Sequence, residues 1–322
     1  KYFMIFKDPV TRISSNLKNF LRTAPLKNNN QDLSTVQIQL PLPDGGTDNF
    51  MVFEAPIMEE GLANKFPNIK TFIFQSTSNQ LRYGRADITL KGFHLMLFDE
   101  ESTIFIDPFS KNNTDIYQVY FKKDCINNKP MPDCLSQEEA STEKLDDSML
   151  KNNQTLNQLK SVKDSNGQTL RTYRIAVSAT AEFTQFHGGT VAEGLSAVVT
   201  SINRVNGVYE REFTIRLVLV ADNDQIIYTD ENTDPFTNPN NAGALLGQNQ
   251  NSVDNIIGSN NYDIGHVVGR SGSGLASYAV VCRNSKASAT TGINNPTGDP
   301  FDIDYLAHEI GHQFAGSHTF NS

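Results

Sequence analysis

The feature that most constrains the fold is a group of three histidines near the end of the sequence. Residues 304–318 read DYLAHEIGHQFAGSH, so His308 and His312 are one helical turn apart and His318 follows six residues later. On a helix, the first two imidazoles share one face. An apolar stripe lies away from that face and consists of Leu306, Ile310 and Phe314. We therefore expect a helix with one side in a core and the other side in a cleft.

These residue types at this spacing predict a zinc site with His308, His312 and His318 as ligands. Neutral imidazoles bind Zn²⁺ at about 2.0–2.1 Å and leave its positive charge intact. Three protein ligands leave a fourth position for water, whose pKa falls to about 7. Glu309 lies beside the histidine face, where it is placed to take the proton of that water and pass it to a leaving amine. The chain must turn before His318, and we place that turn at Gly316.

Composition narrows the class of protein. The chain has 322 residues, a net charge of −9 and 38% hydrophobic residues, which indicates about two globular domains. The acidic balance argues against nucleic acid or an anionic membrane as the main partner, since both require basic patches. No apolar run has the length of a membrane span. The sequence has neither an initiator methionine nor a signal-peptide core, so we expect it to start after a processed segment or to be cut from a longer chain.

The first half of the sequence has the pattern of a β-rich domain. Alternating or apolar runs bounded by turn residues predict strands at 36–40, 50–53, 70–75, 86–90, 102–106 and 116–121, with Pro41 ending the first run and a short helix at 59–65. His94 is the only histidine of this half, and we expect a hydrogen-bonded or surface residue rather than a ligand. Residues 136–170 are polar and predict a cleavable linker, with one helix near 145–159.

From residue 171 the pattern changes to α/β. An alternating strand at 173–179, a helix at 191–202 and a doubly apolar, buried strand at 213–219 form a βαβ unit with a right-handed crossover. Further strands are expected at 263–268 and 275–282, joined by the Gly-rich connection 269–274. The fold class is thus α+β overall: a β-rich N-terminal part followed by an α/β part.

The histidine motif resembles that of the metzincin metallopeptidases, and more closely that of the bacterial secreted reprolysin-like (adamalysin) branch. Residues 274–282 look like the edge strand that pairs with substrate in this branch, and residues 318–321 look like the segment after the third ligand. The first half, around 68–72 and 106–108, is similar to the prodomains of these enzymes. The resemblance implies a prodomain at 1–165, with its polar linker at about 136–170, and a catalytic domain at 171–322. That domain should contain a twisted, mostly parallel sheet with an antiparallel edge strand and an active-site helix.

The resemblance also implies the function. We expect the precursor of a secreted bacterial zinc endopeptidase that hydrolyses proteins or peptides and is inhibited by its own prodomain. The residues expected to pair with substrate are Leu275, Ala276, Ser277, Tyr278 and Ala279. Two alternatives stay open: a non-catalytic zinc-binding surface or adhesion module, and another zinc hydrolase such as an amidase. The C-terminal subdomain of the family, with its Met-turn, is missing, which leaves the activity of this segment open.

The sequence departs from the family pattern at one turn position. The family has glycine three residues after the second histidine, where this chain has Ala315, and glycine follows at 316. If the turn needs a positive φ at 315, alanine would be strained by about 1 kcal/mol or more. Either the turn shifts by one residue or the geometry of the ligands is slightly altered.

The cysteines and the acidic residues leave further alternatives. Cys125 and Cys134 form either a mutual disulfide or a latency switch in which one thiolate binds the zinc, with Asp124 as another latency ligand. The resemblance suggests that Cys282 pairs with a cysteine in the missing C-terminal part. The acidic stretch 222–224, with Asp230, Glu231 and Asp234, is a candidate Ca²⁺ site, although its spacing favours a solvated loop.

Overall fold

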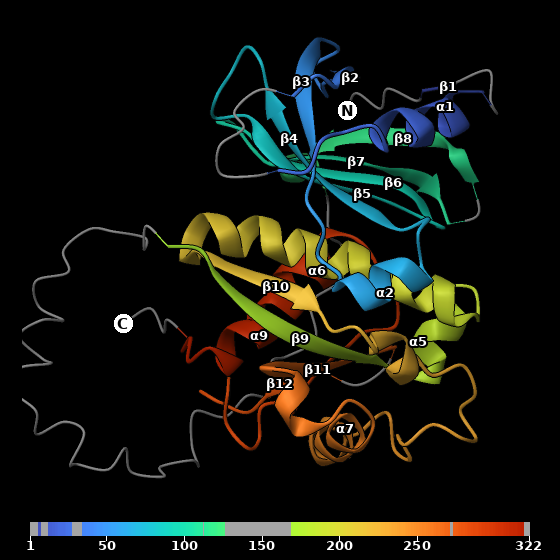
Figure 1. Cartoon of the computed structure of the whole chain (residues 1–322), viewed down its shortest axis with the longest axis vertical. Coiled ribbons are helices and arrows are strands. Elements are labelled where there is room, and N and C mark those ends of the chain that lie inside the picture. The colour runs from blue at the N-terminus through green and yellow to red at the C-terminus, as the bar shows by residue number, and fades with distance from the viewer. Residues whose placement is uncertain are drawn as a thin grey trace, which may run out of the picture.

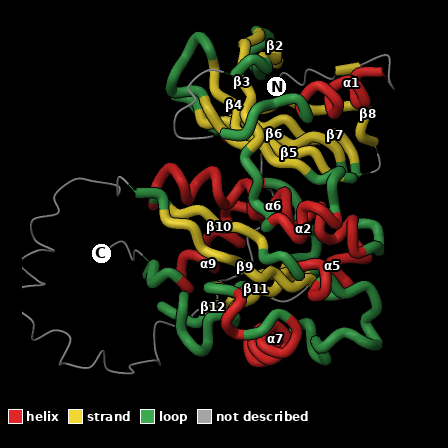
Figure 2. Tube along the Cα trace, viewed as in Figure 1, coloured by secondary structure: helices red, strands yellow, loops and turns green. Residues whose placement is uncertain are grey.

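A computed structural model describes residues 6–7, 12–27, 34–111, 113–125, 169–270 and 273–318. These residues form two sheets stacked with helices between and below them (Figures 1 and 2). The helix expected near 145–159 and Cys134 lie outside the described residues. Within the described ranges, no helix combines the length and the apolarity that a membrane span needs.

The N-terminal half, residues 6–125, is one antiparallel sheet of eight strands in the order β1-β8-β7-β6-β5-β4-β3-β2. The strands are β1 (Phe6–Lys7), β2 (Gln37–Pro41), β3 (Thr47–Glu54), β4 (Lys70–Ser76), β5 (Tyr83–Thr89), β6 (Gly92–Phe98), β7 (Ile104–Ser110) and β8 (Asn113–Phe121). The helical segments are α1 (Arg12–Leu21), α2 (Glu60–Lys65) and η1 (Lys122–Asp124). The six predicted strands and the short helix are therefore confirmed.

Two details of this sheet differ from expectation. Pro41 belongs to β2 and lies opposite Thr47, so it does not end the run before the turn. Strand β6 was not predicted, because its sequence GFHLMLF has almost no polar alternation. The reason is burial: every residue of β6 except His94 is buried, which removes the period of two that marks a half-exposed strand.

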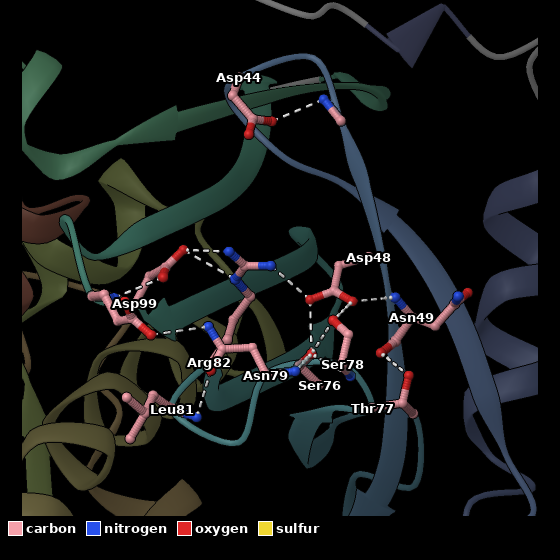
Figure 3. Close-up of polar contacts among 12 residues, drawn as sticks. Asp44, Asp48, Asn49, Ser76, Thr77, Ser78, Asn79, Leu81, Arg82 and Asp99 are labelled. Carbon is pink, nitrogen blue, oxygen red and sulfur yellow. Dashed lines mark hydrogen bonds and ion pairs between the residues drawn. The ribbon is translucent and has the colours of Figure 1, made fainter.

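A polar cluster fastens the β4–β5 turn to the start of β3 (Figure 3). The Asp48 carboxylate accepts hydrogen bonds from Ser76, Ser78 and Arg82, and Arg82 also pairs with Asp99. Burial alone would raise the pKa of Asp48, but these donors more than offset it and lower the pKa. Each charged side chain of the cluster has a partner of opposite charge, so the cluster stabilises the N-terminal sheet.

The C-terminal half, residues 169–318, contains a five-stranded sheet in the order β10-β9-β11-β13-β12. The strands are β9 (Arg171–Ala179), β10 (Ile215–Leu219), β11 (Ile264–Gly269), β12 (Leu275–Ala276) and β13 (Ala289–Gly292). The first four in sheet order run parallel, and β12 pairs antiparallel with β13. The expected parallel sheet with an antiparallel edge strand is thus the observed topology, although β13 was not predicted.

Helices cover both faces of this sheet. They are α5 (Ala181–Phe186), α6 (Val191–Phe213) and α7 (Ala242–Ile256), with short turns η2 (Asn223–Ile226) and η3 (Ser259–Asn261). Ile175 and Val177 of β9 pack in one core with α6, whereas Ala176 packs in a second core with α7. Helices α6 and α7 lie on opposite sides of this sheet (Figure 1). The alternation of β9 therefore builds two cores, and the strand–helix–strand unit β9-α6-β10 is confirmed.

The predicted strand 213–219 starts too early. Phe213 is the last residue of α6 and is 58% exposed, because the helix continues until Thr214 takes a left-handed conformation with φ 54°. Strand β10 lies at the edge of the sheet. Its apolar residues are covered by a segment of the N-terminal half that joins this edge, since Met58 lies in a parallel bridge with Leu219.

Candidate active site

The histidine motif lies on one continuous helix of three parts. They are α8 (Asp299–Phe301), the π-helical segment η4 (Asp302–Ala307) and α9 (His308–Gln313). Leu306 and Ile310 are completely buried, and Phe314 packs against the same core. The expected core face of the helix is confirmed. A π segment is often associated with a functional site, because the extra residue re-aims the following side chains.

The three histidines converge. Their Nε2 atoms lie 3.0 Å apart for His308 and His312, 3.0 Å for His308 and His318, and 3.1 Å for His312 and His318. A tetrahedral zinc ion with bonds of about 2.0–2.1 Å needs its nitrogens about 3.3 Å apart, so small ring rotations suffice. Within the described residues this is the group of His, Cys, Asp and Glu side chains that could hold a metal ion. The donor set fits zinc.

The turn after α9 brings His318 back to the other two rings. The N–H of Gly316 donates to the carbonyl of Gly311, and the N–H of Ala315 donates to the carbonyl of His312, the pattern of a Schellman helix end. Nδ1 of His312 lies 2.7 Å from the Gly316 carbonyl oxygen. Because a carbonyl only accepts, Nδ1 carries the proton and Nε2 of His312 is the unprotonated nitrogen, the form that can bind a metal.

The turn uses the residue that the family pattern has as glycine. Ala315 has φ 71°, and Gly316 is not among the residues with positive φ. Our placement of the turn at Gly316 is therefore wrong, and the alternative of a strained Ala315 is the observed one. The strain is tolerated because the two Schellman hydrogen bonds fix the backbone on either side.

Replacing Ala315 with glycine should raise the free energy of unfolding by about 1 kcal/mol, because glycine reaches positive φ without the steric cost that alanine has. The matched reverse change is Gly316→Ala, where an added Cβ would lie 3.0 Å from the Gly311 carbonyl oxygen. That variant should lose stability. Thermal melts of both proteins measure the effect, and a lower melting temperature for Ala315→Gly would contradict it.

Glu309 is completely buried and packs against a glycine. A Cβ added to Gly274 would clash with the Glu309 carboxylate and the Tyr305 ring, so a larger residue there would have to displace them. The N–H of Gly274 also donates to the hydroxyl of Tyr305, one turn before Glu309. Gly274, directly before β12, therefore packs against the Glu309 carboxylate.

The segment expected to be an edge strand is mostly a turn. Strand β12 contains Leu275 and Ala276 alone, and the strand predicted over 277–282 is wrong. Ala279 and Cys282 have positive φ values of 55° and 60°. The reason is that this segment caps the motif helix: the N–H of Ala279 donates to the His312 carbonyl, and the Tyr278 hydroxyl donates to the Ala315 carbonyl. Of the five residues expected to pair with substrate, Leu275 and Ala276 are the two in a strand, opposite Thr290 and Ala289.

A buried hydrogen-bonded pair, Gln313 and His266, stabilises the end of the motif helix. Nε2 of Gln313 donates to the carbonyls of Gly265 and Lys286, so its Oε1 faces Nδ1 of His266 at 3.0 Å as an acceptor. The other ring nitrogen of His266 accepts from Thr291 at 2.9 Å. Burial lowers the pKa of His266 to about 4, which keeps the ring neutral in this role. Sequence reasoning missed Gln313, although its place directly after His312 was a signal.

Gln313→Leu should lower the free energy of unfolding by about 2–3 kcal/mol, because it leaves the two carbonyls and the His266 ring without their partners in a buried place. The matched control is Gln248→Leu on α7, whose amide bonds to an exposed Thr237 hydroxyl. That change should cost less than about 0.5 kcal/mol. Urea unfolding of both variants measures the difference, and equal losses would show that the pair does not stabilise the helix end.

The cysteines do not join the histidine cluster in the described part of the chain. Cys125 is exposed and free, and burial together with Asp299 raises the pKa of its thiol, which disfavours a thiolate. Cys134 lies outside the described residues, so neither the disulfide nor the cysteine switch is tested. Cys282 is also free and exposed.

The other candidate residues have structural partners. His94 is hydrogen-bonded to Asp87 as expected, and this carboxylate offsets the effect of burial and raises the pKa of the ring. His187 packs against Phe183 and bonds to the Pro296 carbonyl. Of the acidic residues considered for calcium, Asp222 and Asp224 pair with Lys65, and Asp234 accepts from the first N–H of α5.

The π segment is anchored by a buried charge cluster. Arg204 on α6 pairs with Asp302 of η4 and with Asp107 of β7, and the Ser201 hydroxyl donates to Asp302. Burial raises the pKa of Asp302 to about 6 even beside Arg204. The helix that carries the histidines is therefore attached, through one arginine, to the N-terminal sheet.

Comparison with known proteins agrees with this site. The family model of reprolysin-like metallopeptidases, family M12B, matches residues 169–322. Among solved structures, the crystal structure of metalloproteinase-II from Bacteroides fragilis is similar with a TM-score of 0.52 and 12% identity, covering 96% of this chain and 86% of that chain. This likeness concerns the fold and extends over both halves. No curated protein matches the chain.

Proposed function

We propose that the chain is the precursor of a secreted zinc endopeptidase, on the premise that residues 169–322 match the family model of reprolysin-like metallopeptidases, family M12B. The observation that carries the proposal is the convergence of three Nε2 atoms within 3.0–3.1 Å of one another beside a buried glutamate. His308, His312 and His318 would hold the zinc ion. A zinc ion in such a site supplies Lewis acidity, which lowers the pKa of water to about 7.

The residues around the histidines suit peptide hydrolysis. Glu309 would accept a proton from the attacking water and then donate it to the leaving amine. Its carboxylate is completely buried and held against Gly274, so its position relative to the histidines is fixed by packing. The short edge strand with Leu275 and Ala276 would pair with an extended peptide through backbone hydrogen bonds.

The N-terminal half would be the prodomain, as the sequence resemblance implies. The likeness to the solved structure covers 96% of the chain, so the fold of the N-terminal half is part of that likeness. Secretion and intramolecular inhibition by the prodomain are part of the same proposal. They follow from the resemblance to the secreted bacterial branch.

The proposal is tested by metal analysis and casein hydrolysis with the full-length protein. We expect about one zinc ion per chain, loss of hydrolysis with 1,10-phenanthroline, and recovery on adding zinc. A protein that contains zinc but cleaves neither casein nor peptides after treatment with an activating protease would instead be a structural zinc module. A protein that binds no zinc would refute both readings.

A further inference from the structure

The connection between β3 and β4, residues 55–69, projects from the N-terminal sheet and packs against the C-terminal half. We call these residues the arm. The arm contains α2, which lies among the helices and strands of the lower half in Figure 1 rather than with the sheet that it connects. The two strands that flank it pair with each other, Glu54 opposite Phe72. The arm is therefore a projection from an otherwise regular hairpin.

The backbone of the arm extends the C-terminal sheet at its β10 edge. The N–H of Leu219 donates to the Ile57 carbonyl at 2.7 Å, and the N–H of Glu59 donates to the Leu219 carbonyl at 2.9 Å. The N–H of Ala221 donates to the Glu59 carboxylate at 2.8 Å. An uncovered edge strand presents unpaired backbone groups to other chains, and here the arm covers that edge.

The side chains of the arm complete the core of the C-terminal half. Ile57 and Leu62 are completely buried, and Ile69 is 2% exposed. Together with Met58 they belong to the same hydrophobic cluster as β9, α6 and the motif helix. The backbone also approaches closely, because a Cβ added to Gly61 would lie 2.9 Å from the Ala221 side chain. Without the arm, this core would be open to water.

Ion pairs join the two halves along the rest of their interface. In most of them, a basic side chain of the N-terminal half pairs with acidic side chains of the C-terminal half. These pairs are Lys65 with Asp222 and Asp224, Arg85 with Glu210, Lys91 with Glu193, and Lys122 with Asp299 and Asp304. The Arg85 side chain is 2% exposed, so salt screens its pair only weakly. The contact therefore combines an apolar arm with complementary charge.

We infer that cleavage alone does not release the N-terminal half: after the segment between residues 125 and 169 is cut, the two pieces stay bound through the arm and the charged pairs. Every contact given above lies in residues 54–122 or at residue 171 and beyond, so cutting the connecting segment removes none of them. The inference rests on the proposed function only in assuming that a precursor is cut there. Release of the N-terminal half after the cut is the opposite outcome.

The test uses the full chain with a site-specific protease sequence placed within residues 150–165 and with Glu309→Gln to prevent self-cleavage. After complete cutting, native mass spectrometry and gel filtration at about 1 μM should show both fragments together at the mass of the uncut chain. Separate fragments, whether folded or aggregated, would overturn the inference. Neither measurement depends on zinc or on hydrolysis, so failure of the proposed function would be recognised separately.

Two variants test whether the arm holds the two pieces of the cut chain together. Leu62→Ser should raise the dissociation constant of the cut complex by at least about tenfold, because it puts a hydroxyl in the shared core. Lys65→Ala, a milder change, should raise it about two- to fivefold. The matched control is Lys123→Ala, whose partner Glu101 is in the same half. If both arm variants dissociate no more than the control on dilution, the arm does not hold the pieces together.

Discussion

Glutamine in place of Glu309 should lower kcat/KM for casein by about 10²–10⁴-fold, while the zinc content should stay at about one ion per chain. Glutamine has nearly the same shape as glutamate, so it can occupy the buried place against Gly274. It cannot accept a proton from water. The three imidazoles are not changed, and the expected loss is therefore one of proton transfer rather than of metal binding.

The measurement pairs casein hydrolysis with zinc analysis of the same samples. The control is Glu212→Gln, an exposed glutamate of the same half that pairs with Arg211. It should have wild-type activity. Equal activity in Glu309→Gln and wild type would show that Glu309 is not the general base. Loss of zinc in Glu309→Gln would instead show that the carboxylate supports the metal site, and His312→Ala gives the reference for complete loss of zinc.

The histidine site could be predicted from sequence because its ligands are local. His308 and His312 need only a helix, and His318 needs one turn after it, so eleven residues carry the information. The same holds for most strands of the N-terminal sheet, where apolar and polar residues alternate. The local sequence pattern is sufficient for prediction where the burial of a residue depends only on the helix or strand that contains it.

Prediction failed where distant segments decide the local structure. The strand expected over 275–282 ends after Ala276, because the following residues cap the carbonyl end of α9. Strand β10 was expected to be buried because it is apolar on both faces, but the sequence did not reveal that the arm covers it. The pairing of Gln313 with His266 joins residues 47 apart in the sequence. In each case the interacting segment comes from a distant part of the chain, and the periodicity of a single sequence does not reveal it.

The turn at Ala315 shows a different kind of limit. The sequence identified the position and the cost of alanine there, but not which of two turns the chain adopts. The hydrogen bonds of Ala315 and Gly316 to the end of α9, together with the bond from His312 to the Gly316 carbonyl, favour the strained alternative. The turn thus orients the His312 ring at the expense of backbone strain at Ala315. This balance is visible only in the three-dimensional structure.

Methionine in place of Arg204 should lower the free energy of unfolding by about 3–5 kcal/mol at pH 8. The Arg204 and Asp302 side chains are each 3% exposed and Asp107 is 12% exposed, so the change leaves two carboxylates without their cation in a nearly water-free place. Methionine fills most of the volume, and the loss is therefore one of charge pairing rather than of packing. Urea unfolding followed by circular dichroism measures it.

The pH dependence separates this cause from a packing defect. The pKa of Asp302 is about 6 in the folded protein and about 3.9 in an unfolded chain. A raised folded pKa means that stability falls as pH rises through this range, because the buried carboxylate must ionise. Without Arg204 the folded pKa rises further, so the deficit of the variant should shrink between pH 8 and pH 5. Arg82→Met removes the cation between Asp48 and Asp99, where the arginine is 18% exposed, and should cost less. A deficit of Arg204→Met that is equal at both pH values would mean that lost packing, not the uncompensated carboxylates, destabilises the contact between the two halves.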